Sequence, residues 1–195
     1  MSLYKLAVLI SGSGTNLQAI IDAIADGTIH NAKIALVISN REDAFGLERA
    51  KKAGIPNIFI ANNKKDTLLK ILESHGIDAV VLAGYLSLLS EDVVNTYTGK
   101  IINIHPSLIP KYCGKGFYGL KVHQAVIDAG EKFTGATLHF VDSEYDTGKI
   151  LLQRIVPVLP EDTAESLQKR VLKTEHIILI EGINILTKND KNKGI

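Results

Sequence analysis

The stretch "KLAVLISGSGTNLQAI", residues 5–20, decides the fold because it joins a strand pattern to a helix pattern through a glycine-rich turn. Residues 5–10 are nearly all apolar, which is typical of a parallel strand covered on both faces. Residues 16–25 show a helical period and come directly after Gly12 and Gly14. A strand, a tight turn and a helix in this order indicate the first unit of an α/β fold.

The same alternation of strand and helix patterns continues along the chain. It predicts an open, mostly parallel, twisted sheet of about seven strands with helices on both faces. We expect a single domain over residues 1–187 and a polar C-terminal tail over residues 188–195. Strands are predicted over residues 5–10, 33–39, 57–61, 78–83, 100–104, 137–141 and 151–158, and helices over residues 16–25, 43–53, 65–74, 91–97 and 119–129, with a last helix that begins at Asp162 and has a capping-box spacing to Glu165.

The composition limits the partners and the location of the protein. Among 195 residues, 22 Lys and Arg against 21 Asp and Glu give a formal charge of +1, so the overall charge does not indicate nucleic acid or an anionic membrane. Cys113 is the single cysteine, which excludes an internal disulfide and fits a reducing compartment. The start of the chain has no signal-peptide pattern, and no uncharged run reaches the roughly 18 residues that cross a bilayer. We therefore expect a cytoplasmic protein with no membrane partner.

The segment "SGSGTN", residues 11–16, is the first candidate binding site. Gly12 and Gly14 permit a tight turn and a close backbone approach, and the N–H groups of the following helix favour an anion such as phosphate. The third glycine of a dinucleotide-binding fingerprint would fall at Leu17, so that fingerprint is incomplete. The alternative is a strand-to-helix turn that binds nothing.

Asn103 and His105 form the second candidate site. They are two residues apart at the end of a predicted strand, so their side chains leave the same face, and Pro106 ends the strand. An amide donor beside an imidazole suits a reaction in which a carbonyl oxygen becomes an oxyanion. The alternative is a buried polar pair satisfied by backbone groups. Ser107 and Cys113 follow closely but have no nucleophile signature.

The acidic segment "DSEYDTG", residues 142–148, follows the sixth predicted strand. A calcium loop that starts at Asp142 requires Gly at 147 and Glu at 153, where the chain has Thr147 and Gln153, so calcium is excluded. One carboxylate is instead expected to pair with His105, raise its pKa and keep it protonated near neutral pH, with Asp146 the preferred candidate. The six histidines have no metal-ligand spacing, and no metal is expected.

Several long motifs together resemble the glycinamide ribonucleotide transformylases, the phosphoribosylglycinamide formyltransferases of the formyltransferase superfamily. The resemblance extends over nearly the whole chain and is carried by "LISGSGTNLQAI", "SNREDAFGLERAKKAGI", "VVLAGYL", "INIHPSLIPKY", "GATLHFVDSEYDTG" and "TEH". It implies a Rossmann-like formyltransferase fold. It also implies transfer of a formyl group from 10-formyltetrahydrofolate to the glycine amine of N1-(5-phosphoribosyl)glycinamide in de novo purine (IMP) biosynthesis, by a monomer or homodimer that uses small-molecule substrates and no metal.

The resemblance also implies roles for individual residues. Asn103 and His105 would stabilise the oxyanion, and Asp146 would support charged His105 and assist proton transfer. Thr137 and His139 would support this trio. The implied ribonucleotide-binding residues are Gly14, Thr15 and Asn16 for the phosphate and Glu175 for the ribose; the implied folate-binding residues are Lys64, Leu86, Ser87, Leu88, Leu89, Asn103, Asp142, Ser143, Glu144, Tyr145 and Asp146.

This chain departs from many relatives at two places, and other functions remain open. Ser87 stands where some relatives carry Arg, and the segment around Lys64 is shorter than in many relatives. A formyltetrahydrofolate hydrolase or a methionyl-tRNA formyltransferase shares the core motifs, but each is expected to carry an additional domain. A nucleotide-binding module, for example for NADP, is a further alternative, suggested by Gly12, Gly14 and Arg41. The intact trio argues against a non-catalytic member of the family.

Overall fold

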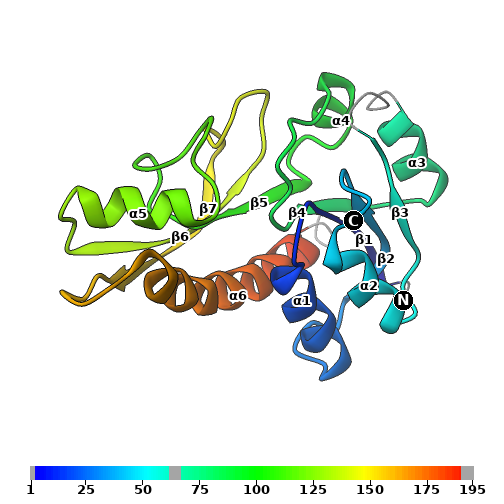
Figure 1. Cartoon of the computed structure of the whole chain (residues 1–195). Helices are drawn as coiled ribbons and strands as arrows, with labels where there is room; N and C mark the ends of the chain where they lie inside the picture. Colours follow the sequence, from blue (N-terminus) through cyan, green and yellow to red (C-terminus); the bar gives the residue numbers. More distant parts are fainter. Residues whose placement is uncertain (1–2, 62–66, 190–195) are drawn as a thin grey trace.

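The computed structural model describes residues 3–61 and 67–189, which form a seven-stranded sheet with the order β3-β2-β1-β4-β5-β6-β7 (Figure 1). The strands are β1 (Tyr4–Ile10), β2 (Ala32–Ser39), β3 (Asn57–Phe59), β4 (Ala79–Leu82), β5 (Ile101–His105), β6 (Phe133–Phe140) and β7 (Ile150–Pro157). The helices are α1 (Thr15–Ala25), α2 (Phe45–Lys52), α3 (Leu68–Ser74), α4 (Glu91–Thr96), α5 (Leu120–Asp128) and α6 (Ala164–Asn189). Lys64 and the predicted helix start at residue 65 lie outside the described residues.

The pairing of the strands confirms the predicted open, mostly parallel sheet. β1 pairs in parallel with β2 and β4, as do β2 with β3 and β4 with β5, whereas β5–β6 and β6–β7 are antiparallel. Among the strands, the predicted boundary that differs most is the start of β6, which begins at Phe133 and not at residue 137. A glycine inside a strand ordinarily weakens it. Gly135 instead allows β7 to pass close to β6, because a Cβ at this position would collide with the Arg154 carbonyl oxygen.

Helices cover both faces of the sheet, as predicted, and two apolar cores lie beneath them. Leu6, Val8 and Ile10 belong to the core shared with α1, α2, α5 and α6, whereas Ala7 and Leu9 belong to the core shared with α3 and α4. Alternate residues of β1 therefore point to opposite faces, and both faces are apolar because both are covered.

The last helix, α6, begins differently from the prediction. The Thr163 N–H donates to Ser166 Oγ at 3.0 Å and the Ser166 N–H donates to Thr163 Oγ1 at 3.2 Å, so these two residues form the reciprocal cap. Asp162 instead binds Arg170, with bonds of 2.6 and 2.8 Å to its guanidinium. The predicted cap of Asp162 with Glu165 is therefore wrong, because Arg170, about two helical turns further along, binds the aspartate.

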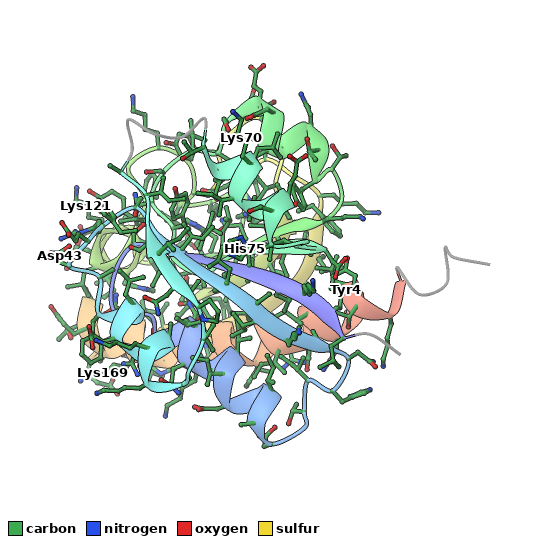
Figure 2. The ribbon with its side chains drawn as sticks, turned by 90° about the vertical axis from the view of Figure 1, so that its right-hand side faces the viewer. Tyr4, Asp43, Lys70, His75, Lys121 and Lys169 are labelled. Atoms are coloured by element: carbon green, nitrogen blue, oxygen red, sulfur yellow. The ribbon has the colours of Figure 1, made fainter. Side chains whose placement is uncertain are left out.

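The strand order reverses at β1, whose neighbours β2 and β4 continue to opposite edges of the sheet. At such a point the loops after the strands separate and leave a crevice for a ligand. Charged side chains such as Asp43, Lys121 and Lys169 lie at the periphery of the molecule (Figure 2). Among the described residues, no helix has the length and apolar character needed to cross a membrane.

Candidate active site

A cavity of about 650 Å³ lies at the carboxyl ends of the central strands. It brings together segments far apart in sequence, and most of the predicted site residues line it. These are Thr15, Asn16, Leu86, Ser87, Leu88, Leu89, Asn103, His105, Asp142, Glu144, Tyr145, Asp146 and Glu175. Gly14 and Ser143 are not among its lining residues, and Lys64 lies outside the described part of the chain.

The glycine-rich turn brings the N-terminus of α1 to the cavity. Gly14 caps the helix with φ +70, a left-handed conformation that favours glycine, and a Cβ there would lie 2.7 Å from Gly46 Cα. No side chain caps α1, so the N–H groups of its first turn face outward at a positive helix end. Arg49, which the sequence reasoning missed, donates to the Ser13 carbonyl at 2.8 Å and adds positive charge beside this turn.

Glu175 and Asn16 form a buried polar pair in the same cavity. Asn16 Nδ2 donates to Glu175 Oε2 at 2.9 Å, although the two residues are 159 positions apart. Glu175 is only 6% exposed, so it does not lie on a solvated helix face, and burial raises its pKa. Asn16 Oδ1 is buried without a partner. These oxygens fit hydroxyl groups of a ligand, which would donate to both.

The antiparallel pairing of β5 with β6 sets the geometry of the polar cluster. Asn103 lies opposite His139, and His105 lies opposite Thr137. Their side chains share one face of the sheet, because Ile102 and Ile104 belong to the core on the other face. The predicted common face of Asn103 and His105 is confirmed. His139 of strand β6 lies 3.1 Å from Asn103 Nδ2, whereas the Thr137 hydroxyl bonds the Ser107 carbonyl and the Ile109 N–H.

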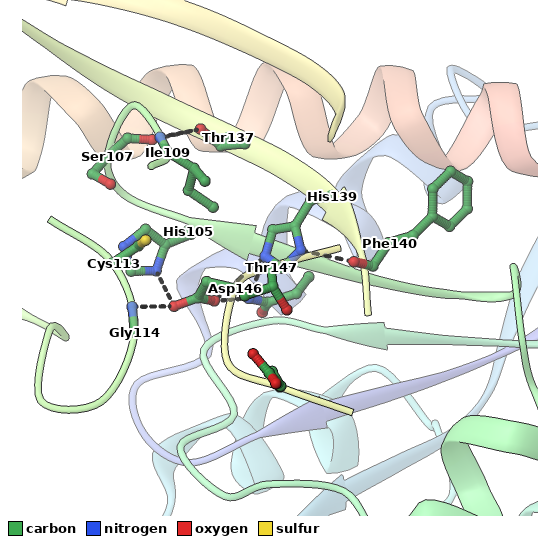
Figure 3. Close-up of polar contacts among 12 residues, drawn as sticks. His105, Ser107, Ile109, Cys113, Gly114, Thr137, His139, Phe140, Asp146 and Thr147 are labelled. Atoms are coloured by element: carbon green, nitrogen blue, oxygen red, sulfur yellow. Dashed lines mark hydrogen bonds and ion pairs between the residues drawn. The ribbon is translucent and has the colours of Figure 1, made fainter. Parts of the chain in front are cut away.

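Asp146 connects this cluster, as Figure 3 shows. Its Oδ1 accepts a bond of 3.1 Å from Asn103 Nδ2 and lies 3.4 Å from His139 Nε2. Its Oδ2 accepts a bond of 2.8 Å from the Gly114 N–H and lies 3.6 Å from His105 Nδ1. Asp146 itself has φ 56, an uncommon backbone conformation for a residue other than glycine. Such conformations cluster at functional sites.

The protonation state of His105 differs from the prediction. Its Nε2 lies 2.9 Å from the Tyr112 carbonyl oxygen, which can only accept, so Nε2 carries a proton and Nδ1 faces Asp146. Burial lowers the pKa of His105 and outweighs the opposite effect of the Asp146 carboxylate. The expectation of a raised pKa is therefore wrong for the free protein, and His105 is neutral near pH 7.

Asp146 stays ionised in the same environment. Burial by itself would raise its pKa, but hydrogen bonding from His139 and from the Gly114 N–H contributes to outweighing it, and the pKa lies below its ordinary value. The site thus holds a carboxylate beside a neutral imidazole whose Nδ1 can accept a proton. That pair can take a proton from one reacting group and give it to another.

Two loops form the apolar wall of the cavity. Leu86, Leu88 and Tyr145 are 50%, 38% and 41% exposed, which suits contact with a flat, largely apolar ring. Ser11 Oγ accepts from the Leu86 N–H at 2.8 Å and fixes one loop to the end of β1. Ser87 Oγ accepts from Asn40 Nδ2 at 2.7 Å, so its hydroxyl is used within the protein.

Three other side chains that could react, His123, Ser107 and Cys113, belong to segments beside the cluster; Figure 3 shows the last two. His123 on α5 lines the cavity, and its Nδ1 is buried without a partner; a lone histidine in an amphipathic helix gave no signal in the sequence. Ser107 Oγ donates to the Lys111 carbonyl at 2.7 Å, and burial raises the pKa of Cys113, so neither is arranged as a nucleophile.

Within residues 3–61 and 67–189, no three His, Cys, Asp or Glu side chains gather as metal ligands.

Comparison with known protein families shows to which family a chain with this site belongs. Residues 4–183 match the formyl transferase family. The chain belongs to the formyl transferase family. Its match to this family extends from β1 almost to the end of α6, so it includes the cavity and the polar cluster.

Similar formyl transferases carry a more specific name. The phosphoribosylglycinamide formyltransferase of Haemophilus influenzae is 48% identical over 89% of this chain and 82% of its own length. The chloroplastic phosphoribosylglycinamide formyltransferase of Arabidopsis thaliana is 41% identical over 93% of this chain, which spans 65% of that relative's length. The crystal structure of glycinamide ribonucleotide transformylase 1 from Symbiobacterium toebii has a TM-score of 0.89 and 40% identity, with 96% of this chain and 89% of that chain covered.

Proposed function

We propose that the chain is a phosphoribosylglycinamide formyltransferase that transfers formyl from 10-formyltetrahydrofolate to the glycine amine of N1-(5-phosphoribosyl)glycinamide in purine biosynthesis. The observation that carries the proposal is the Asp146 carboxylate, held between Asn103 and His105 in a cavity that also contains the uncapped start of α1. An anion site, an oxyanion-stabilising pair and an apolar wall are the three features that this reaction requires.

The two ends of the cavity fit the two substrates. The first turn of α1 would bind the phosphate through its N–H groups, with Thr15 beside it. Asn16 and Glu175 would accept hydrogen bonds from the ribose hydroxyls. The loops around Leu86 and Tyr145 would hold the pterin ring.

The reaction forms a bond between the glycine nitrogen and the formyl carbon and breaks the bond from that carbon to the folate nitrogen. The attacking amine is neutral, and the formyl oxygen becomes an oxyanion to which Asn103 would donate a hydrogen bond. His105 would add to this stabilisation once its Nδ1 has taken the proton of the amine and the imidazole is charged. The amine loses one proton and the folate nitrogen gains one. His105 Nδ1, held next to Asp146, is the group placed to carry that proton, because Nε2 is bound to the main chain.

We infer a cytoplasmic enzyme, monomeric or homodimeric, with small-molecule substrates and no nucleic-acid or membrane partner. The formal charge of +1 supports the absence of a polyanionic partner.

A turnover assay with and without the ribonucleotide tests the proposal. The purified chain is mixed with 10-formyltetrahydrofolate, and the folate absorbance is followed. We expect folate turnover only when the glycinamide ribonucleotide is present. Turnover without the ribonucleotide, and no formylated product with it, would instead indicate a formyltetrahydrofolate hydrolase.

A further inference from the structure

The loop after β5 makes main-chain contacts with both members of the His105–Asp146 pair. The Tyr112 carbonyl accepts from His105 Nε2 at 2.9 Å, and the Gly114 N–H donates to Asp146 Oδ2 at 2.8 Å. Figure 3 shows Gly114 and Cys113 beside the pair. The position of this short loop therefore determines which nitrogen of His105 is free and where the carboxylate lies.

The loop adopts a conformation that needs support from outside. Tyr112 has φ 54, in the left-handed region that residues with a side chain adopt at a cost. Residues held in this region of conformational space persist only where surrounding contacts fix them.

Glu131 supplies the main polar contact. The Tyr112 hydroxyl donates to Glu131 Oε1 at 3.0 Å, and Lys111 Nζ lies 2.7 Å from the same oxygen. The Glu131 N–H donates to the Val126 carbonyl at 3.2 Å, which fixes Glu131 to the end of α5. The Tyr112 ring also packs edge to face on Phe117, with 6.2 Å between the ring centroids.

We propose that Glu131 and Tyr112 are positioning residues for formyl transfer: their side-chain hydrogen bond holds the Tyr112 carbonyl against His105 Nε2 and keeps Nδ1 directed to Asp146. The Tyr112 hydroxyl and the Glu131 carboxylate bond each other, and His105 is bonded by the Tyr112 carbonyl, so the two side chains act through the Tyr112 main chain. The catalytic consequence rests on the proposed function, whereas the choice of nitrogen on His105 does not. The ion pair of Glu131 with Lys111 is exposed and contributes little by itself.

Nitrogen NMR of the histidine-labelled full chain tests the structural part without any substrate. In the unmodified chain we expect His105 to carry its proton on Nε2. In Tyr112→Phe and Glu131→Ala we expect a mixture of the two neutral forms. Lys111→Met, which keeps the Tyr112–Glu131 bond, and Glu131→Gln, which keeps an acceptor, should both retain the original form. An unchanged His105 signal in Tyr112→Phe and Glu131→Ala would overturn the proposal.

Kinetics test the catalytic part. We expect Tyr112→Phe and Glu131→Ala to lower kcat about tenfold, and to change each KM less than about twofold, because misplacement of a reacting group affects the chemical step. In the kcat–pH profile of these two variants, the limb that reports the protonation of His105 should move to lower pH, because the lost Tyr112 contact raises the pKa of His105. The other titratable neighbours of His105 are Asp146, His139 and His123. A kcat loss in Lys111→Met equal to that in Glu131→Ala would overturn the route through Tyr112. Failure of the unmodified chain to transfer formyl would contradict the proposed function alone.

Discussion

Asp146 is the residue on which the polar cluster depends, because its two oxygens contact Asn103, His105 and a main-chain N–H. Its neighbours in the loop are used differently: Asp142 Oδ1 accepts from the Glu144 N–H and from Thr147 Oγ1. Only one carboxylate of this acidic segment therefore reaches the cluster. Replacing it is the most direct test at the scale of a single residue.

We expect Asp146→Asn to lower kcat at least about tenfold, because the neutral amide cannot support a proton on His105 Nδ1. Steady-state formyl transfer measures the effect. Asp128→Asn, the same change at the exposed end of α5, serves as the matched control. An unaltered kcat in Asp146→Asn would remove this carboxylate from the mechanism.

The anion site is tested at Thr15, the first residue of α1. We expect Thr15→Glu to raise the Kd for the ribonucleotide at least about tenfold, since a carboxylate beside the phosphate repels it. The helix should still form, because a negative charge is favourable at a helix N-terminus. Calorimetry of the binding measures the effect, and Thr15→Gln separates charge from size. Undiminished affinity in Thr15→Glu would contradict the phosphate assignment.

At the scale of an element, α6 carries Glu175 into the cavity and packs closely on β6. Gly182 permits this approach, since a Cβ there would collide with Leu138 Cδ2, and Leu138 is fully buried. We expect Gly182→Ala to lower the free energy of unfolding by about 1–2 kcal/mol, because overpacking outweighs the roughly 1 kcal/mol gain in helix propensity. Urea unfolding measures it. Ile177→Ala, at a half-exposed position of the same helix, should change stability little.

At the scale of the whole molecule, buried histidines make stability depend on pH. Burial lowers the pKa of His123 to about 4, and it also lowers the pKa of His105 and His176. The folded state then binds fewer protons than the unfolded state below pH 6.5, so the unfolding free energy falls as pH falls from about 6.5 toward 4. The raised pKa of Glu175 acts in the opposite direction.

Between pH 7 and pH 4, we expect the free energy of unfolding to fall by about 2 kcal/mol less in His123→Leu than in the unmodified chain. The reason is that leucine, unlike His123, has no proton to bind on unfolding. Urea unfolding at several pH values measures the difference. Parallel curves for the two proteins would show that His123 is not held neutral in the folded state.

The sequence by itself determined the class of fold and the location of the site. Its alternating strand and helix patterns, with apolar strands, leave few options other than a covered parallel sheet. Glycines after β1 placed a helix start at the carboxyl edge, and the spacing of Asn103 and His105 placed them on one face. These features are local, so periodicity and turn chemistry suffice to predict them.

Only the tertiary structure decided the partners and their protonation. The choice of Asp146 over Asp142 and Glu144 and the burial of Glu175 beside Asn16 depend on contacts between distant segments. The pKa of His105 was predicted in the wrong direction because sequence shows the nearby carboxylate but not the desolvation. Desolvation depends on everything that surrounds a group, and that is determined only when the whole chain has folded.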